Sequence, residues 1–230
     1  MRTKWMRRAF PLVGLAALAG VAAHAQTDVA ASLYGAFSGT ATANGVMQSP
    51  SNAAGGLLEV RHIAKPWFGY EGTYSYNRAN QTYFSQSFAV CGVCNAEKVW
   101  THVSANAHEV TGDWVASLKI SNLRPFALAG GGLLLDVPSG QASTTTTITA
   151  CGGAPSCTPG TTTIAAITST TTKPVFVYGG GLDWGLLPHI GLRLQYRGNL
   201  YKAPNLTTLF TATNAFTHTA EPMIGAYFRF

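Results

Sequence analysis

The sequence predicts an all-β fold, an eight-stranded antiparallel up-and-down transmembrane β-barrel that follows a cleaved signal peptide. Three observations predict this fold. The chain begins with a basic and then apolar leader, short segments of alternating apolar and polar residues recur after it, and residues 225 to 230 (Gly-Ala-Tyr-Phe-Arg-Phe) end on spaced aromatics. Alternating segments of about ten residues, separated by turns, are the sequence signature of a membrane barrel.

The first 25 residues have the three parts of a secretory signal peptide. Four basic side chains lie within residues 2 to 8, an apolar stretch runs from Leu12 to Ala23, and Ala23-His24-Ala25 forms a small-residue cleavage site. The apolar stretch is shorter than the roughly 20 residues that a helix needs to cross a bilayer. We therefore expect residues 1–25 to be removed and residues 26–230 to form one outer-membrane barrel domain.

Removal of the leader changes the charge balance. The chain has 15 Lys and Arg and 9 Asp and Glu, and the leader holds 4 of the basic residues, so 11 against 9 leaves +2. The sequence pI of about 9.3 is therefore no argument for a nucleic-acid partner. After residue 25 no apolar run reaches the length of a membrane-spanning helix.

Alternation and turn residues divide the rest of the chain into strands and connections. The connections alternate in length: long at 42–55, 78–101, 137–172 and 202–216, and short at 64–66, 117–123 and 186–189. Long extracellular loops and tight periplasmic turns are typical of outer-membrane barrels, and an even strand count returns both termini to the periplasm. A secreted β-sandwich is the alternative, but it has no reason to place every long loop at one end. The eight strands are expected at 29–41, 56–63, 67–77, 102–116, 124–136, 173–185, 190–201 and 217–230.

The phase of each strand follows from the cost of placing charge in lipid. In the strand at 190–201, Arg193 and Arg197 alternate with apolar residues, and the opposite phase would place each Arg in lipid at about 2 to 4 kcal/mol. An eight-stranded barrel is narrow enough for side chains to fill, so we expect opposite charges to pair and occlude the lumen. The phase of the fourth and fifth strands stays open, because a bulge near His108 would shift it. The lumen charge network is expected to comprise Glu59, Arg61, Glu71, Glu109, Asp113, Asp183, Arg193, Arg197, Glu221 and Arg229.

Aromatic residues gather near the ends of these strands. Two aromatic girdles are expected where a barrel meets the lipid headgroups. Tyr76 and Tyr201 are expected in the outer girdle. The periplasmic girdle is expected to contain Trp67, Trp114, Phe126, Trp184 and Phe230.

With these features in place, the mature chain resembles the small eight-stranded outer-membrane barrels of Gram-negative bacteria, of which the OmpA membrane domain is the familiar example. The resemblance is one of pattern over residues 26–230. Its most specific element is the C-terminal assembly signal, matched by Gly225, Phe228 and Phe230, although Met223 stands where the family usually has a polar residue. The resemblance implies delivery by periplasmic chaperones, insertion by the barrel assembly machinery, contact with outer-membrane lipid and lipopolysaccharide, and a monomer. Some relatives carry a peptidoglycan-binding module, which we do not expect after Phe230.

The four cysteines all fall in predicted extracellular loops, Cys91 and Cys94 in the second and Cys151 and Cys157 in the third. An oxidising compartment favours disulfides. Local pairs 91–94 and 151–157 are expected, and a cross-loop arrangement is the open alternative. No His accompanies either pair at a ligand spacing, and Gly112 stands where an HExxH motif beginning at His108 would need its second His. We expect no metal and no cofactor.

The expected function is that of a non-catalytic, porin-like but occluded barrel with an envelope-structural or adhesive role. The loop at 137–172, rich in Thr, Ser and Gly, is expected to be largely mobile and to be the best candidate for contact with a cell-surface ligand. One alternative is a narrow channel for small solutes. Another is a lipid A-modifying enzyme, for which His218 with Ser85 or Ser104 would have to supply the base and the nucleophile.

Overall fold

The computed structural model describes residues 26–87, 94–151 and 160–230, and within them the chain is all-β. Every strand pairing in this part is antiparallel. The strands are β1 (Gln26–Ser38), β2 (Ala41–Ala43), β3 (Val46–Pro50), β4 (Ala53–Lys65), β5 (Phe68–Ser87), β6 (Cys94–Ser117), β7 (Leu123–Pro138), β8 (Ser143–Cys151), β9 (Gly160–Ala165), β10 (Thr171–Gly185), β11 (Ile190–Lys202) and β12 (Phe216–Arg229).

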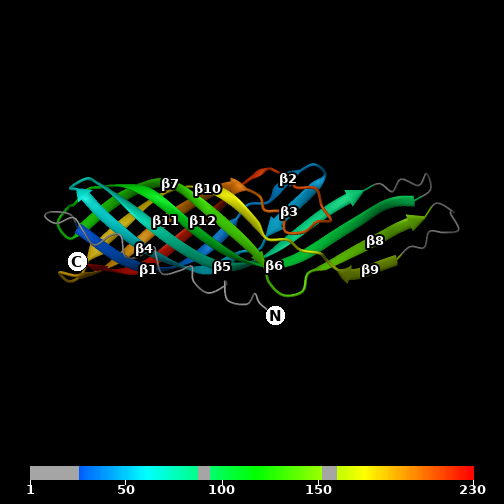
Figure 1. The fold of residues 1–230 in the computed structure, drawn as a ribbon, viewed down its shortest axis with the longest axis horizontal. Coiled ribbons are helices and arrows are strands. Elements are labelled where there is room, and N and C mark those ends of the chain that lie inside the picture. Colours follow the sequence, from blue (N-terminus) through cyan, green and yellow to red (C-terminus); the bar gives the residue numbers. More distant parts are fainter. Residues whose placement is uncertain (1–25, 88–93, 152–159) are drawn as a thin grey trace, which may run out of the picture.

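Eight of these strands form a closed barrel (Figure 1). Around the barrel the order is β5, β4, β1, β12, β11, β10, β7 and β6, and the pairing of β6 with β5 closes the ring. Closure leaves the barrel part of the sheet without free edges, which is what a sheet needs inside a hydrocarbon layer. The prediction of an eight-stranded antiparallel barrel is confirmed.

The two ends of the barrel differ, and we call them the turn end and the loop end. The turn end holds the short connections after β4, β6 and β10, and there the backbone N–H of Phe230 donates to Thr27 O over 2.9 Å. Figure 1 shows the C-terminus at this end and β8 and β9 at the opposite, loop end. The predicted alternation of long and short connections therefore corresponds to two distinct faces of the molecule.

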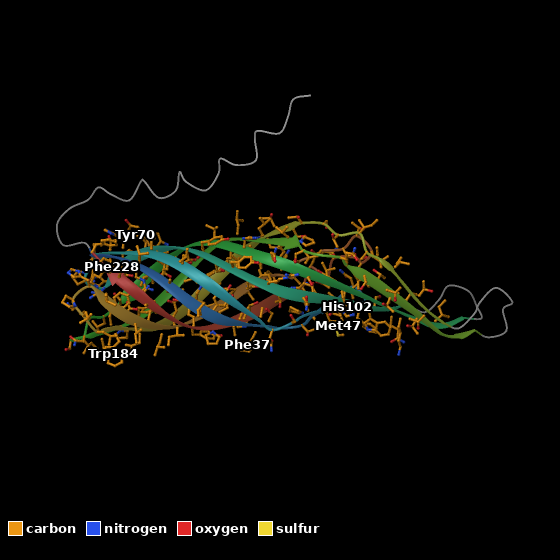
Figure 2. All side chains as sticks on the ribbon, turned by 90° about the horizontal axis from the view of Figure 1, so that it is seen from below. Phe37, Met47, Tyr70, His102, Trp184 and Phe228 are labelled. Carbon is orange, nitrogen blue, oxygen red and sulfur yellow. The ribbon has the colours of Figure 1, made fainter. Side chains whose placement is uncertain are left out.

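Residues of the barrel strands alternate between the outside and the inside of the barrel. On β11, Leu194 and Tyr196 are exposed, while Arg193 and Arg197 are buried. Exposed apolar side chains cover the outside of the other strands as well, and the labelled residues of Figure 2, such as Phe37 and Trp184, project away from the ribbon. An apolar band of this extent is expected where a protein contacts lipid.

The register also fixes the phase of the fourth and fifth barrel strands. The pairing of β6 with β5 and with β7 runs without a shift past His108. Glu109 and Asp113 on β6 therefore point inward, as do Phe126 and Leu128 on β7.

Two of the predicted girdle residues are wrong. Phe126 is only 6% exposed and lies inside the barrel, because β7 directs its even-numbered residues inward. Tyr201 follows the inward phase of β11, and its hydroxyl hydrogen-bonds that of Thr219 at 2.9 Å. The other expected members of the girdles are exposed: Trp67, Tyr76, Trp114, Trp184 and Phe230.

The long connections contain more strand than predicted. β5 continues to Ser87 and β6 begins at Cys94, so most of the segment predicted as a loop at 78–101 is a continuation of two barrel strands. The segment at 137–172, expected to be largely mobile, contains β8 and β9, whose threonine hydroxyls meet across the strands at 3.1 and 3.2 Å. Threonine is β-branched and favours such pleated pairs.

A small hydrophobic core lies inside the loop end. It joins Val46 of β3, Tyr83 of β5 and Val103 of β6 to Leu206 and Phe210 from the β11–β12 connection. The Tyr83 hydroxyl donates to Pro204 O at 2.8 Å and accepts from Leu206 N at 3.0 Å. The β11–β12 connection thereby covers the inner side of the loop-end sheet.

Candidate functional site

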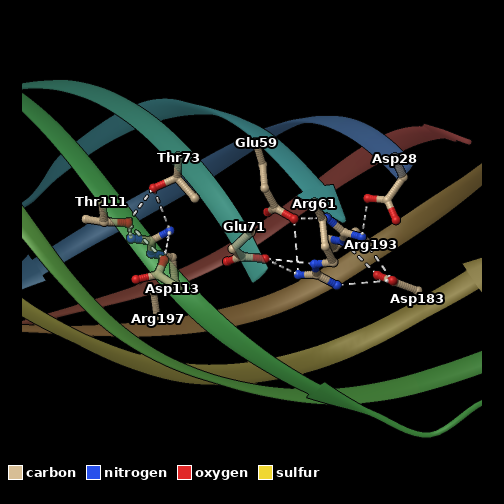
Figure 3. Close-up of polar contacts among 10 residues, drawn as sticks. All are labelled: Asp28, Glu59, Arg61, Glu71, Thr73, Thr111, Asp113, Asp183, Arg193 and Arg197. Carbon is tan, nitrogen blue, oxygen red and sulfur yellow. Dashed lines mark hydrogen bonds and ion pairs between the residues drawn. The ribbon is translucent and has the colours of Figure 1, made fainter. Parts of the chain in front are cut away.

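The candidate site is the barrel interior, where inward-facing charged residues from neighbouring strands meet (Figure 3). Arg193 on β11 lies at its centre. Its Nε donates to Asp183 Oδ1 at 2.6 Å and its Nη2 to Asp28 Oδ1 at 3.0 Å, and its Nη1 contacts Glu59. One guanidinium thus links β1, β4 and β10 to β11.

Arg61 on β4 completes this first cluster. Its Nη2 lies 2.7 Å from Glu71 Oε2 and 3.1 Å from Glu59 Oε1, and its Nη1 lies 3.3 Å from Asp183 Oδ2. The Phe126 ring lies 4.0 Å from the guanidinium carbon, a cation–π contact. Every charged group of the cluster is at most 2% exposed.

Arg197 is at the centre of a second cluster. On β11 the inward-facing residues Arg193, Gln195 and Arg197 follow one another, so this cluster lies closer to the loop end than the first. Its Nη2 lies 3.2 Å from Glu109 Oε1 and its Nη1 3.6 Å from Asp113 Oδ2. The hydroxyls of Thr73 and Thr111 accept from the same guanidinium at 3.1 and 3.2 Å. Buried charges are tolerated when they are paired and hydrogen-bonded in this way.

One wall of the interior is apolar. Phe126 and Leu128 of β7 pack with Val175 and Val177 of β10. A Cβ added at Gly181 would come closest to the backbone O of Leu194 and would lie 2.7 Å from Phe126 Cζ, in both cases closer than real side chains approach. Absence of a side chain at this position therefore makes room for the ring beneath Arg61.

Towards the loop end the interior becomes acidic. Glu221 and Asp136 are buried there, and they line, with Glu109 and Asn199, a cavity of about 30 Å³. A cavity needs a volume of about 10 to 15 Å³ to hold one water molecule. The space suits about two waters and is far too small for a solute path.

The structure places nine of the ten predicted network residues in the interior at 3% exposure or less. The exception is Arg229, which is half-buried at the turn end with Nη2 3.3 Å from the Tyr227 hydroxyl. Glu221 is buried in the interior, and among the residues that the structure describes no Lys or Arg lies within ion-pair distance of its carboxylate. Sequence reasoning missed several interior polar residues, although the same alternation could have found them: Asp28, Arg124, Asp136 and Asn199.

The exterior has the opposite character. All eight Asp and Glu side chains that the structure describes are at most 4% exposed. The exposed charged side chains of the described residues are therefore basic, and they include Arg78 and Lys202 near the loop end and Lys65 and Lys119 at the turn end. Lys202 lies 5.9 Å from the Phe216 ring.

The predicted disulfides fall largely outside the described residues. Cys91 and Cys157 are not described, and the side chains of Cys94 and Cys151 are not described either. The backbone register places Cys94 opposite Cys151 on β6 and β8. The local pairs 91–94 and 151–157 therefore stay predictions.

The residues of the predicted assembly signal lie on β12 and just after it. Gly225 pairs with Ser32 of β1, and the rings of Phe228 and Phe230 meet edge to face at 5.1 Å on the outside of the barrel. Among residues 26–87, 94–151 and 160–230, no three His, Cys, Asp or Glu side chains are arranged to hold a metal. No helix in that same part of the chain is long and apolar enough to cross a membrane.

A closed antiparallel barrel, an apolar exterior with aromatic residues at its turn end and an ionic interior together define a transmembrane β-barrel of the bacterial outer-membrane type. No family model matches the chain, and no curated protein matches it.

Several solved structures are similar in chain path. Ail, the attachment invasion locus protein of Yersinia pestis, has a TM-score of 0.43 at 14% identity, covering 90% of this chain and 99% of its own. Neisserial surface protein A has a TM-score of 0.42 at 12% identity, covering 89% and 97%. The outer membrane protein OprG of Pseudomonas aeruginosa has a TM-score of 0.44 at 9% identity, covering 89% and 95%.

Proposed function

We propose that this chain is a non-catalytic outer-membrane barrel that presents its loop-end sheet at the cell surface, in an envelope-structural or adhesive role. The filled lumen is the observation that carries the proposal. Three guanidiniums cross-link the interior from Asp28 near the turn end to Glu109 near the loop end. The small hydrophobic core around Tyr83 fills the inside of the loop end. An aqueous channel would need an interior that side chains leave open.

Planar-bilayer recording tests the filled lumen. The purified barrel is inserted into a lipid bilayer, with a known porin as the control for insertion and recording. We expect no stepwise conductance from the wild-type protein and regular steps from the porin. Regular steps from the wild-type protein would favour the alternative, a narrow channel for small solutes.

The proposed orientation places the loop end outside the cell and the turn end in the periplasm, after removal of residues 1–25. The position of the short turns supports it, because outer-membrane barrels keep their short turns in the periplasm. An epitope inserted at Gly140 in the β7–β8 connection should be stained by antibody on intact cells. The same epitope at Ser121 in the β6–β7 turn should be stained only after permeabilisation, and the reverse pattern would contradict the orientation.

Lipopolysaccharide is the proposed lipid partner around the loop end. Arg78 and Lys202 point outward there, and no described carboxylate on the exterior competes for them. Basic side chains at this level match the phosphates of a lipopolysaccharide leaflet. Chaperones and the barrel assembly machinery are proposed as partners during insertion, through Phe228 and Phe230.

The loop-end sheet supplies the surface for an adhesive role. On its outer face Phe84 and Trp100 pair at 5.2 Å, next to the exposed Met47 across the β3–β5 register. Phe84 follows Tyr76 by eight residues on β5, about 26 Å of strand beyond that girdle residue. Aromatic residues so far from the membrane are candidates for contact with another surface. Phe84→Ala with Trp100→Ala should reduce the binding of expressing cells to host cells or glycans, and unchanged binding would leave the envelope-structural role.

The contacts of the candidate catalytic residues support a non-catalytic barrel. His218 Nε2 lies 2.9 Å from the Tyr178 hydroxyl, Ser104 Oγ donates to Asn80 Oδ1 at 2.6 Å, and Ser85 Oγ donates to Gly45 O at 3.0 Å. A serine nucleophile needs a base within hydrogen-bond reach, and the base considered for these serines is bound to a tyrosine. Mass spectrometry of lipid A from expressing cells should show no change, and a lost or added acyl chain would contradict the proposal.

A further inference from the structure

A second cavity lies at the turn end, apart from the lumen network. Its volume is about 400 Å³, and it is lined by the β6–β7 turn, the β10–β11 turn and the end of β12. Its charged lining residues are Lys119, Arg124, Arg229 and Asp183. This cavity is large enough for a small organic anion, whereas the loop-end cavity holds only water.

Asp183, the carboxylate that lines this cavity, does not balance the charge of the cavity's basic residues. Both oxygens of Asp183 are engaged by the interior arginines, Oδ1 by Arg193 Nε at 2.6 Å and Oδ2 by Arg193 Nη2 at 2.9 Å and Arg61 Nη1 at 3.3 Å. Among the described residues, no carboxylate lies within ion-pair distance of Lys119, Arg124 or Arg229. The cavity therefore has a surplus of cations.

Arg124 is the strongest indication of a ligand. Its side chain is more than nine-tenths buried, and its Nη2 donates to Gln26 Oε1 at 2.9 Å. Its Nε and Nη1 have no hydrogen-bond partner among the described residues. Arg229 Nε, at the same cavity, also has none. Buried donors left without a partner are costly, and a guanidinium presents its donors in a fork that matches the oxygens of phosphate or carboxylate.

We propose that the turn-end cavity binds a phosphate-bearing anion through Arg124, Arg229 and Lys119. Three cations match the several oxygens of a phosphate group, which carries two negative charges as a monoester and one as the diester of a phospholipid headgroup. With the turn end in the periplasm, as proposed above, the phosphate can belong to a small periplasmic molecule or to a phospholipid headgroup of the inner leaflet. The binding chemistry itself does not depend on that orientation.

Calorimetric titration of the barrel in nanodiscs tests the site. In phosphatidylcholine nanodiscs, inorganic phosphate and glycerol 3-phosphate are each titrated into the wild-type protein and into Lys119→Gln, Arg124→Gln and Lys65→Gln. Lys119 and Lys65 are both exposed turn-end lysines, but only Lys119 lines the cavity. We expect Lys119→Gln and Arg124→Gln to weaken binding at least tenfold and Lys65→Gln to leave it unchanged.

The same titration in nanodiscs that contain phosphatidylglycerol separates the two sources. Loss of phosphate binding there identifies a lipid headgroup as the occupant, and retained binding identifies a soluble phosphate. No phosphate binding by the wild-type protein in phosphatidylcholine, or equal weakening by Lys65→Gln and Lys119→Gln, would overturn the proposal. Because Lys119 is exposed on a turn, its variant keeps the test valid even if Arg124→Gln fails to fold. A negative result would leave the barrel, its orientation and its closed lumen untouched.

Discussion

Arg193 contacts carboxylates on three other strands, those of Asp28, Glu59 and Asp183. Its removal would leave these buried groups with less compensating charge, and breaking a buried ionic network in this way costs about 3 to 5 kcal/mol. We predict that Arg193→Leu lowers the free energy of unfolding by that amount. Urea titration of the refolded barrel, followed by tryptophan fluorescence, measures it.

The matched control is Arg78→Leu, because Arg78 is exposed on the outside of β5. Its effect on the free energy of unfolding should be small. Equal effects of the two substitutions would contradict the central position of Arg193.

The interior positions on β4, β5, β11 and β12 could be predicted from the sequence. Where arginine or glutamate alternates with apolar residues, a strand with the charged side chains facing lipid is too costly, so they must face inward. The partners of each charge could not. Arg61 and Glu71 face each other in the β4–β5 register, but Arg193 and Glu59 lie on strands that do not pair, so that contact depends on the diameter of the closed barrel. Asp28 was missed because the first strand was predicted to begin at residue 29.

At the scale of the element, β10 shows how one small residue permits an interior contact. A methyl group at Gly181 would collide with the backbone O of Leu194 on β11 and with Phe126, whose ring is held against Arg61. Overpacking of this kind costs about 1 to 3 kcal/mol. We predict that Gly181→Ala lowers the free energy of unfolding by this amount in the same urea titration.

Gly72 on β5 provides the control, because a Cβ there would meet no atom within 4 Å. Gly72→Ala should therefore leave the free energy of unfolding nearly unchanged. A neutral effect at Gly181 would show that neither the Leu194 backbone nor the Phe126 ring is held close to this position.

The β2–β3 hairpin was not predicted, although its turn carries a recognisable signal. Asn44 and Gly45 have φ values of 53° and 74°, the left-handed pair that a tight two-residue hairpin requires. Gly45→Val should raise the rate of proteolysis at this hairpin, because a β-branched residue is strained at positive φ. Limited proteolysis followed by mass spectrometry measures that rate, and Gly160→Val is the control, since Gly160 has open space around it and no positive φ. Equal rates would contradict the turn geometry.

The extent of the loop-end strands could not be predicted for a different reason. Polar Thr and Ser tracts lack the alternation that marks a half-buried strand, and β8 and β9 are stabilised by pairing with each other and with β6. Such tertiary pairing overrides a weak local signal.

At the scale of the whole molecule, the described tryptophans report two environments. Trp67, Trp114 and Trp184 are exposed at the turn end of the apolar band, whereas Trp100 lies in the loop-end sheet. In vesicles of brominated lipid, a variant that keeps only Trp114 should be strongly quenched. A variant that keeps only Trp100 should fluoresce as it does in unbrominated lipid, and strong quenching of Trp100 would place the loop-end sheet in the membrane.

Strand β11 has residues that face the closed, ionic interior and residues that face the lipid. Spin labels along this strand therefore measure the accessibility of both sides. Single cysteines from position 190 to 202, in a background whose native cysteines are replaced by serine, are labelled with a nitroxide in lipid vesicles. We predict that labels at Leu194 and Tyr196 collide with oxygen dissolved in the lipid, while the label at Gln195 collides with neither oxygen nor a water-soluble nickel complex. Strong collision of the nickel complex with the label at Gln195 would reveal a water-filled pore and contradict this account.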